Sequence, residues 1–183
     1  YHARTLPGLL ASLDAAGVPR SDVFVVVGDC PRGSALRRVR VPPPPARRLG
    51  RRPPIARSEL CNMDDTGLMW AVSPQGTRAL RRFDWIFYVH DTVQVWPAFG
   101  ADVRAVLDQM LAAEPAAPAF KVSQVSMSMG YYRLSALQAA REAVLATTNT
   151  DPARRLDIKY RVEDRVFNVL RATTVLNDAY KRD

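Results

Sequence analysis

The stretch Phe83-Asp-Trp-Ile-Phe-Tyr-Val-His-Asp-Thr92 carries the strongest structural signal in the chain. Its centre is apolar at consecutive positions, which is typical of a strand covered on both faces, as in a parallel sheet. Its end carries an imidazole and a carboxylate, His90 and Asp91. We therefore predict a buried strand over 83–90 that ends at a polar edge.

Moving outward, Asp22-Val-Phe-Val-Val-Val-Gly-Asp29 repeats the buried-strand signature, and a short strand is expected around 120–125. Apolar residues at helical spacing predict a first helix through Leu6, Leu9, Leu10 and Leu13 that stops at Gly17. Further helices are expected from Asp64 or Asp65 to Leu80 with a bend or break at Pro74, and over about 99–111, 134–145 and 152–170. Helices alternating with apolar strands predict an α/β fold, a mainly parallel sheet sandwiched by helices.

The chain of 183 residues is expected to form a single domain over 1–183. Its net charge of +8 is accounted for by nine arginines between Cys30 and Ser58, where no acidic residue occurs. The same window holds seven of the 14 prolines, including Pro42 to Pro45. Because proline fixes φ and removes backbone donors, we predict a solvated Pro/Arg-rich loop at about 31–57.

No apolar run approaches the ~20 residues that a membrane-spanning helix needs, and the amino end does not have the pattern of a signal peptide. These features predict a soluble domain, with the cytoplasm as the favoured compartment. Cys30 and Cys61 are too few for a disulfide framework and are interpreted as thiols.

Polar residues that follow the predicted strands are candidates for a binding site, because ligands of open α/β sheets bind beyond the carboxyl ends of the strands. Asp29 ends the first strand, although an aspartate there can also be a simple turn former. His90 and Asp91 end the second, and their nitrogen and oxygen donors could hold a divalent cation against a phosphate.

The last predicted helix carries an acid on its apolar stripe. Glu163 lies three residues after Tyr160 and four before Phe167, on the side that faces the core. Because burying an ionised carboxylate is costly, Glu163 either pairs with an arginine such as Arg133 or faces a polar cleft. Asp164 points about 100° further round the helix. Either acid could serve as a general base.

The order of these features resembles a nucleotide-sugar glycosyltransferase of the GT-A type, inverting and similar to family two. The residues that carry the resemblance are the opening 1–18, Phe83 to Thr92, Phe120-Lys-Val122, Ser126-Met-Ser-Met-Gly-Tyr-Tyr-Arg133 and Val162-Glu-Asp-Arg165. The chain starts at the loop that follows the first strand of such enzymes. Val89 stands where the first aspartate of their metal-binding motif is usual, which leaves Asp91 with His90 before it.

The resemblance implies a GT-A-like, Rossmann-related nucleotide-binding fold and the transfer of a hexosyl or deoxyhexosyl group from a UDP- or GDP-sugar to a glycan or other hydroxyl acceptor. It implies Asp164 as the catalytic base, with Glu163 second, and Asp91 as the ligand of Mn²⁺ or Mg²⁺. The remaining residues that it assigns to donor and acceptor binding are Asp29, His90, Ser126, Ser128 and Gly130. A metal-independent transferase would instead neutralise the diphosphate with basic side chains.

Two other functions remain open at this point. A nucleic-acid-binding module could use the Pro/Arg-rich loop, since arginine binds phosphate well, although that window offers no aromatic side chain for stacking. A nucleotidyltransferase with a similar sheet would likewise bind phosphate groups with the help of a metal ion. Trp70 and Trp96 could stack on sugars or belong to the core.

Overall fold

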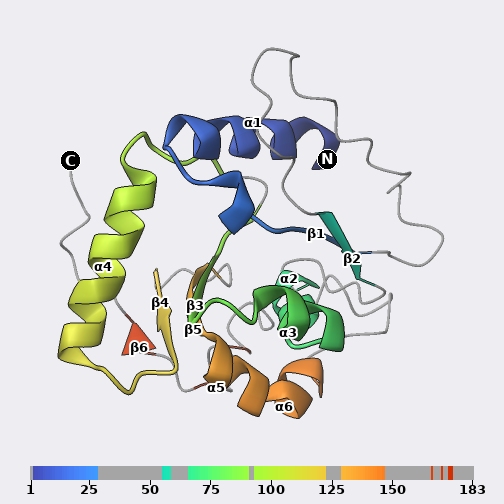
Figure 1. The fold of residues 1–183 in the computed structure, drawn as a ribbon, viewed down its shortest axis with the longest axis vertical. Coiled ribbons are helices and arrows are strands. Elements are labelled where there is room, and N and C mark those ends of the chain that lie inside the picture. Colours follow the sequence, from blue (N-terminus) through green and yellow to red (C-terminus); the bar gives the residue numbers. More distant parts are fainter. Residues whose placement is uncertain are drawn as a thin grey trace, which may run out of the picture.

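The computed structural model describes residues 2–28, 55–58, 66–90, 93–122 and 129–146, together with Val166, Leu170, Thr173 and Thr174. Its helices are α1 (His2–Ala15), the 3₁₀ helix η1 (Arg20–Asp22), α2 (Thr66–Ala71), α3 (Pro74–Leu80), α4 (Phe99–Ala113), α5 (Leu134–Ala139) and α6 (Arg141–Ala146). Its strands are β1 (Val25–Gly28), β2 (Ile55–Ser58), β3 (Trp85–Tyr88), β4 (Ala119–Lys121), β5 (Gly130–Arg133) and β6 (Thr173–Thr174) (Figure 1).

The larger sheet has the strand order β3-β5-β4-β6. β5 lies between β3 and β4 and runs antiparallel to both. β6 pairs with the other side of β4 in parallel, with Lys121 opposite Thr174. β1 and β2 form a separate two-stranded parallel sheet. Two strands of the same direction, β3 and β4, are thus joined through one reversed strand.

This topology shows that the expected mainly parallel sheet sandwiched by helices, of the GT-A-like and Rossmann-related kind, is wrong. The centre of the larger sheet, β3-β5-β4, is antiparallel. The physical reason lies in the connection after β4: the link from Lys121 to Gly130 is shorter than the dozen or more residues that a parallel crossover takes. Consecutive apolar residues indicate that a strand is buried on both faces, but they do not indicate whether it pairs in parallel or antiparallel.

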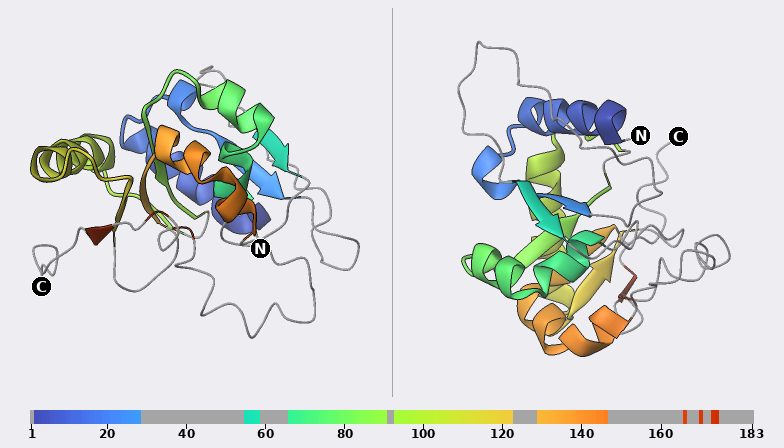
Figure 2. Two further views of the ribbon diagram at one scale, coloured as in Figure 1. Left: turned by 90° about the horizontal axis from the view of Figure 1, so that it is seen from below. Right: turned by 90° about the vertical axis from the view of Figure 1, so that its right-hand side faces the viewer.

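One face of the larger sheet belongs to the largest core cluster. Side chains alternate along a strand, so the register places Ile86, Tyr88, Tyr132 and Ala119 on the same face. They pack with apolar residues of α2, α3, α5 and α6, and with Val166 and Leu170. Leu137, at the centre of this cluster, has no exposed surface. These short helices therefore form one cover of the sheet (Figure 2).

The opposite face of the sheet packs on α4. Phe120 stacks on Trp85 with ring centroids 5.6 Å apart, and Tyr131 meets Phe87 edge to face at 4.7 Å. Apolar residues of α4, among them Val103 and Leu107, complete this cluster. The Tyr131 hydroxyl donates a hydrogen bond of 2.9 Å to the Val103 carbonyl oxygen, so the ring is fixed at both ends.

A third cluster joins α1 to the segment between β3 and α4. Leu9 and Leu13 of α1 pack with Phe99, Val93 and Val95. The Val95 amide also donates to Ser12 Oγ at 3.1 Å. The amphipathic helix expected at the start of the chain is confirmed, and its buried stripe holds this segment in place.

The end of α1 follows the expectation that the helix stops at Gly17. Gly17 has φ = 70°, and its amide donates to the Asp14 carbonyl oxygen while the Val18 amide donates to that of Leu13. This is the Schellman pattern of a helix end, which favours glycine at the left-handed position. Asp14 also pairs with Arg20, whose hydrogen bond lowers the pKa of the Asp14 carboxyl.

The predicted break at Pro74 is confirmed, because α2 ends at Ala71 and α3 begins at Pro74. Ser73 caps α3: its Oγ accepts from the Gly76 amide at 3.1 Å. Pro74 stands at the first helical position, where no amide donor is needed. Gly76 is buried where the two helices meet, and a Cβ there would lie within 2.8 Å of Ala71 Cα and against the Trp70 carbonyl.

Three strands are missing from the sequence prediction: β2, β5 and the short β6. β2 overlaps the end of the stretch interpreted as a Pro/Arg-rich loop, and β5 forms the second half of the segment 126–133 that carries the resemblance. The helix expected over 134–145 is divided into α5 and α6 at Ala140. The expected caps Asp64 and Asp65, and all of the expected helix over 152–170 except Val166 and Leu170, lie outside the described residues.

Gly76→Ala is expected to lower the free energy of unfolding by at least about 2 kcal/mol, because the new methyl group meets backbone atoms that cannot move without separating α2 from α3. For a chain of this size that loss corresponds to a melting temperature lower by roughly 4–8 °C. Calorimetry or circular dichroism measures the change.

Gly8→Ala in α1 is the matched control, because the nearest atom to its Cβ is the side-chain tip Gln94 Nε2 at 3.3 Å, which can shift. Alanine is favoured over glycine in a helix by ~1 kcal/mol, so Gly8→Ala is expected to be neutral or stabilising. Equal losses in the two variants would contradict the close helix contact at Gly76.

Candidate functional site

Four strand ends form a row across one edge of the larger sheet. Tyr88 at the carboxyl end of β3 lies opposite Gly130 at the amino end of β5, which in turn lies opposite Lys121 at the carboxyl end of β4. Thr174 of β6 continues the row beyond Lys121. We call these four residues the strand-end row. Neighbouring strands are ~4.8 Å apart, so the row spans roughly 14 Å.

His90 is the predicted site residue that the structure describes at the β3 end of the row. The residue is 8% exposed, and its ring meets the Tyr88 ring edge to face, with centroids 5.6 Å apart. Its carbonyl oxygen accepts from the Val93 amide at 3.4 Å. His90 is therefore a buried residue at the exit of β3, packed against an aromatic ring.

Gly67 of α2 determines where the Tyr88 ring can lie. A Cβ at Gly67 would be 2.5 Å from Tyr88 Cε2 and 3.2 Å from its hydroxyl oxygen. The absent side chain lets the ring lie directly on the helix, next to His90. Gly67, Tyr88 and His90 thus form one packed unit at the end of β3.

Gly130 is the second predicted site residue within the described part of the chain. It is buried, and it stands between Tyr88 and Lys121 in the strand-end row. Because glycine contributes no side chain, the row has none between the Tyr88 ring and the Lys121 stem. Lys121 is half-buried and shares the face of Tyr88 by register.

Lys121 had no predicted role, and strand pairing adds it to the site. The sequence did not mark Lys121 as a strand end: the strand expected around 120–125 places it near the start, whereas β4 ends at Lys121. Its partner across the sheet could not be known before β5 was recognised as a strand.

The remaining predicted site residues are Asp29, Asp91, Ser126, Ser128, Glu163 and Asp164, and they lie outside the described residues. Three of the described strand ends adjoin them in sequence. Asp29 follows the last residue of β1, Asp91 follows His90, and Ser128 comes two residues before Gly130. These six residues keep the assignments of the sequence analysis as predictions.

Arg133, the candidate partner of Glu163, is held by other contacts. Its guanidinium donates to the carbonyl oxygens of Ala117, at 3.1 Å, and Pro115. It also lies over the Trp85 ring, 4.8 Å from the centroid. Within the described residues Arg133 thus ties the end of β5 to the turn before β4.

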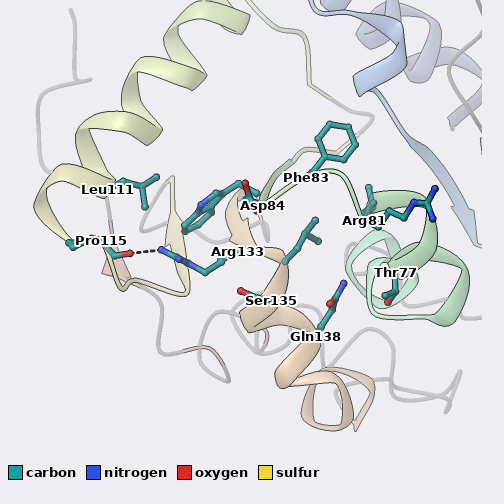
Figure 3. A pocket seen from close by; sticks show the side chains of 12 residues that line it. Thr77, Arg81, Phe83, Asp84, Leu111, Pro115, Arg133, Ser135 and Gln138 are labelled. Carbon is teal, nitrogen blue, oxygen red and sulfur yellow. Dashed lines mark hydrogen bonds between the residues drawn. The ribbon is translucent and has the colours of Figure 1, made fainter.

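A groove with a volume of about 690 Å³ opens at the other end of β3 (Figure 3). Asp84, Thr77 of α3, and Ser135 and Gln138 of α5 line it, and the hydrogen bond from Arg133 to Pro115 lies among the lining residues. The strand-end row is at the opposite end of the same strand, so this groove is separate from the predicted site.

Metal binding receives no support from the described side chains. They contain no group of three or more His, Cys, Asp or Glu that could hold an ion. His90 is the described member of the predicted ligand pair, and its ring packs on Tyr88. A divalent cation therefore stays a prediction that depends on Asp91.

Trp70 and Trp96, which the sequence left open as core residues or sugar-stacking residues, differ in their exposure. Trp70 is 5% exposed and packs on Phe24 with ring centroids 6.2 Å apart, so it belongs to the core. Trp96 is 48% exposed. Among the described residues it is the one large apolar side chain that lies on the surface.

No family model, no curated protein and no solved structure matches the chain. None of the described helices has both the length and the apolar composition that crossing a membrane requires.

Gly67→Ala is expected to displace the Tyr88 ring and to lower the free energy of unfolding by about 1–3 kcal/mol, the usual cost of overpacking. If the contact with the Tyr88 ring is the cause, Gly67→Ala should cost less free energy of unfolding in a Tyr88→Leu background. The double-mutant cycle should give a coupling of at least about 0.5 kcal/mol between the two positions in urea unfolding. Strictly additive losses would show that Gly67 and Tyr88 do not meet.

Proposed function

We propose that the chain is a glycosyltransferase that moves a hexosyl or deoxyhexosyl group from a UDP- or GDP-sugar to an acceptor hydroxyl, with inversion at the anomeric carbon. The sequence resemblance supports this proposal. One observation of the fold also supports it: in the strand-end row, β3 and β4 end at the same edge of the sheet, on either side of β5.

The strand-end row matters because the predicted binding residues flank it in sequence. His90 and Asp91 come two and three residues after the end of β3, and Ser126 and Ser128 belong to the link that joins β4 to β5. Both segments are attached to the same edge of one sheet. A ligand bound over that edge can contact both, which suits a donor with a nucleotide at one end and a sugar at the other.

The reaction needs a base on the acceptor side. The base removes the proton from the acceptor hydroxyl as its oxygen bonds to the anomeric carbon, and the bond from that carbon to the diphosphate oxygen breaks on the opposite face. Asp164 is the proposed base, with Glu163 as the alternative assignment. The proton ends on the carboxylate, and the nucleoside diphosphate departs as an anion.

The departing diphosphate needs positive charge. Mn²⁺ or Mg²⁺ held by Asp91 would supply it by neutralising the phosphate oxygens. Lys121 can add a cation at the same edge of the sheet, since it lies in the strand-end row beside Gly130.

Binding of UDP or GDP is the first expected outcome. A screen of both diphosphates and their sugars, with and without Mn²⁺ or Mg²⁺, should raise the melting temperature, since a ligand at a hundredfold excess over Kd adds about 2.7 kcal/mol of stability. Asp91→Asn should abolish the gain that depends on metal. Lys121→Gln should weaken diphosphate binding at least about tenfold, in keeping with a charge-assisted hydrogen bond.

Arg104→Gln is the charge-matched control for Lys121→Gln, because Arg104 is an exposed cation of α4, on the helix that covers the other face of the sheet. It should leave diphosphate binding unchanged. The binding proposal fails if no diphosphate stabilises the chain, or if Lys121→Gln and Arg104→Gln weaken binding alike.

Turnover tests the assignment of the base. Asp164→Asn is expected to lower kcat by at least about a hundredfold with donor binding nearly unchanged, because general-base catalysis contributes ~10²–10⁴-fold. Glu163→Gln is the matched variant one residue away. If Glu163→Gln removes turnover and Asp164→Asn keeps it, the roles are exchanged; if both variants keep it, neither acid is the base.

The products separate the other candidate functions. Release of a nucleoside diphosphate indicates glycosyl transfer, whereas release of pyrophosphate indicates a nucleotidyltransferase. Salt-dependent affinity for nucleic acid that disappears when residues 36–55 are deleted would indicate a nucleic-acid-binding module instead.

A further inference from the structure

Trp96 lies in the segment that leads from β3 past α1 into α4 (Figure 1). Almost half of its surface is exposed, although its ring is firmly held. The indole Nε1 donates to Asp102 Oδ2 at 2.6 Å, and the ring meets Phe99 edge to face with centroids 5.1 Å apart at 87°. The two contacts fix the polar edge of the ring and its position over α4.

The backbone that carries Trp96 is fixed as well. The preceding residue, Val95, donates its amide to Ser12 Oγ and packs among Leu9 and Leu13 of α1. Phe99 in turn meets Phe87 of β3 at 5.6 Å. The exposed ring is therefore anchored to α1, α4 and β3, and a ligand that stacks on it meets a surface that needs no further ordering.

The size and surroundings of the ring decide what it can bind. A large contiguous apolar patch would mark a protein interface, whereas Trp96 is a single exposed large apolar side chain among the described residues. A nucleotide would bring its phosphates towards the Asp102 carboxylate. A neutral sugar ring fits both features: its C–H face can lie on the indole, and a hydroxyl can donate to the second carboxylate oxygen of Asp102.

We propose that Trp96 and Asp102 form a saccharide-binding subsite, with the indole as a stacking platform and the carboxylate as a hydroxyl acceptor. The subsite lies six residues beyond His90 in sequence, and the Val93 amide ties the segment between them to the His90 carbonyl oxygen. In an extension that rests on the proposed glycosyltransferase function, the bound saccharide is the acceptor.

The first test measures binding without a donor. Methyl β-D-glucopyranoside, methyl β-D-galactopyranoside and N-acetylglucosamine are titrated while the quenching of tryptophan emission by acrylamide is followed. At least one glycoside should lower the quenching constant about twofold at saturation. Trp96 dominates this signal because Trp70 is buried and Trp85 is half-buried.

Variants locate the effect. By calorimetry, Trp96→Ala should weaken glycoside binding at least about fivefold, in keeping with the loss of one aromatic contact. Trp96→Phe should recover part of the affinity, and Asp102→Asn should weaken it about threefold through the lost hydroxyl acceptor. Asp108→Asn, an exposed carboxylate on the same helix, is the matched control and should change nothing.

The saccharide subsite is overturned if no glycoside protects Trp96, if Trp96→Ala binds as tightly as the unaltered chain, or if UMP protects the ring where glycosides do not. The test also separates the two proposals. If glycosides bind at Trp96 and no nucleotide sugar is turned over, the glycosyltransferase function fails and the subsite stands. If turnover occurs and Trp96→Ala leaves the acceptor KM unchanged, the subsite fails and the function stands.

Discussion

The fold depends on the insertion of β5 between two strands that run the opposite way. Its consecutive residues Tyr131 and Tyr132 point to opposite faces of the sheet. Each is almost completely buried, in a different core cluster. Tyr132 packs among the helices α2, α5 and α6, whereas Tyr131 packs under α4 and bonds to it through its hydroxyl. One strand thus joins both cores and also sets the register that brings Tyr88 and Lys121 to the same edge.

The first helix and the break between α2 and α3 could be predicted from the sequence because the signals that set them are local. The leucine spacing of α1, the glycine at its end and the division at Pro74 each depend on residues within one or two turns. The antiparallel sheet was not readable in this way. Gly130-Tyr-Tyr-Arg133 has neither a long apolar run nor a clean alternation, and both of its faces are buried, so its sequence did not indicate a strand.

In the predicted site, too, some features depend on local sequence and others on contacts between distant segments. A polar end was predicted for the strand over 83–90, and His90 follows the last residue of β3 by two positions. Gly130 was assigned from the resemblance alone, and its place at the amino end of β5 follows only from the strand pairing. The neighbourhood of Lys121, and the packing of His90 on Tyr88 over Gly67, arise from contacts between segments far apart in sequence. Exposure is likewise a tertiary property: the sequence left Trp70 and Trp96 equivalent, and only packing makes one a core residue and the other a surface ring.

The position of β5 also has a consequence for synthesis of the chain. β3 emerges from the ribosome about forty residues before the strand that pairs with it, and β4 must wait about fifty more residues for β6. Until then Trp85-Ile-Phe-Tyr88 is an apolar segment with open backbone donors and acceptors, the kind of edge that invites pairing with another chain. The β4–β5 hairpin is the pairing of lowest contact order, so it is expected to form first and to capture β3 as it closes.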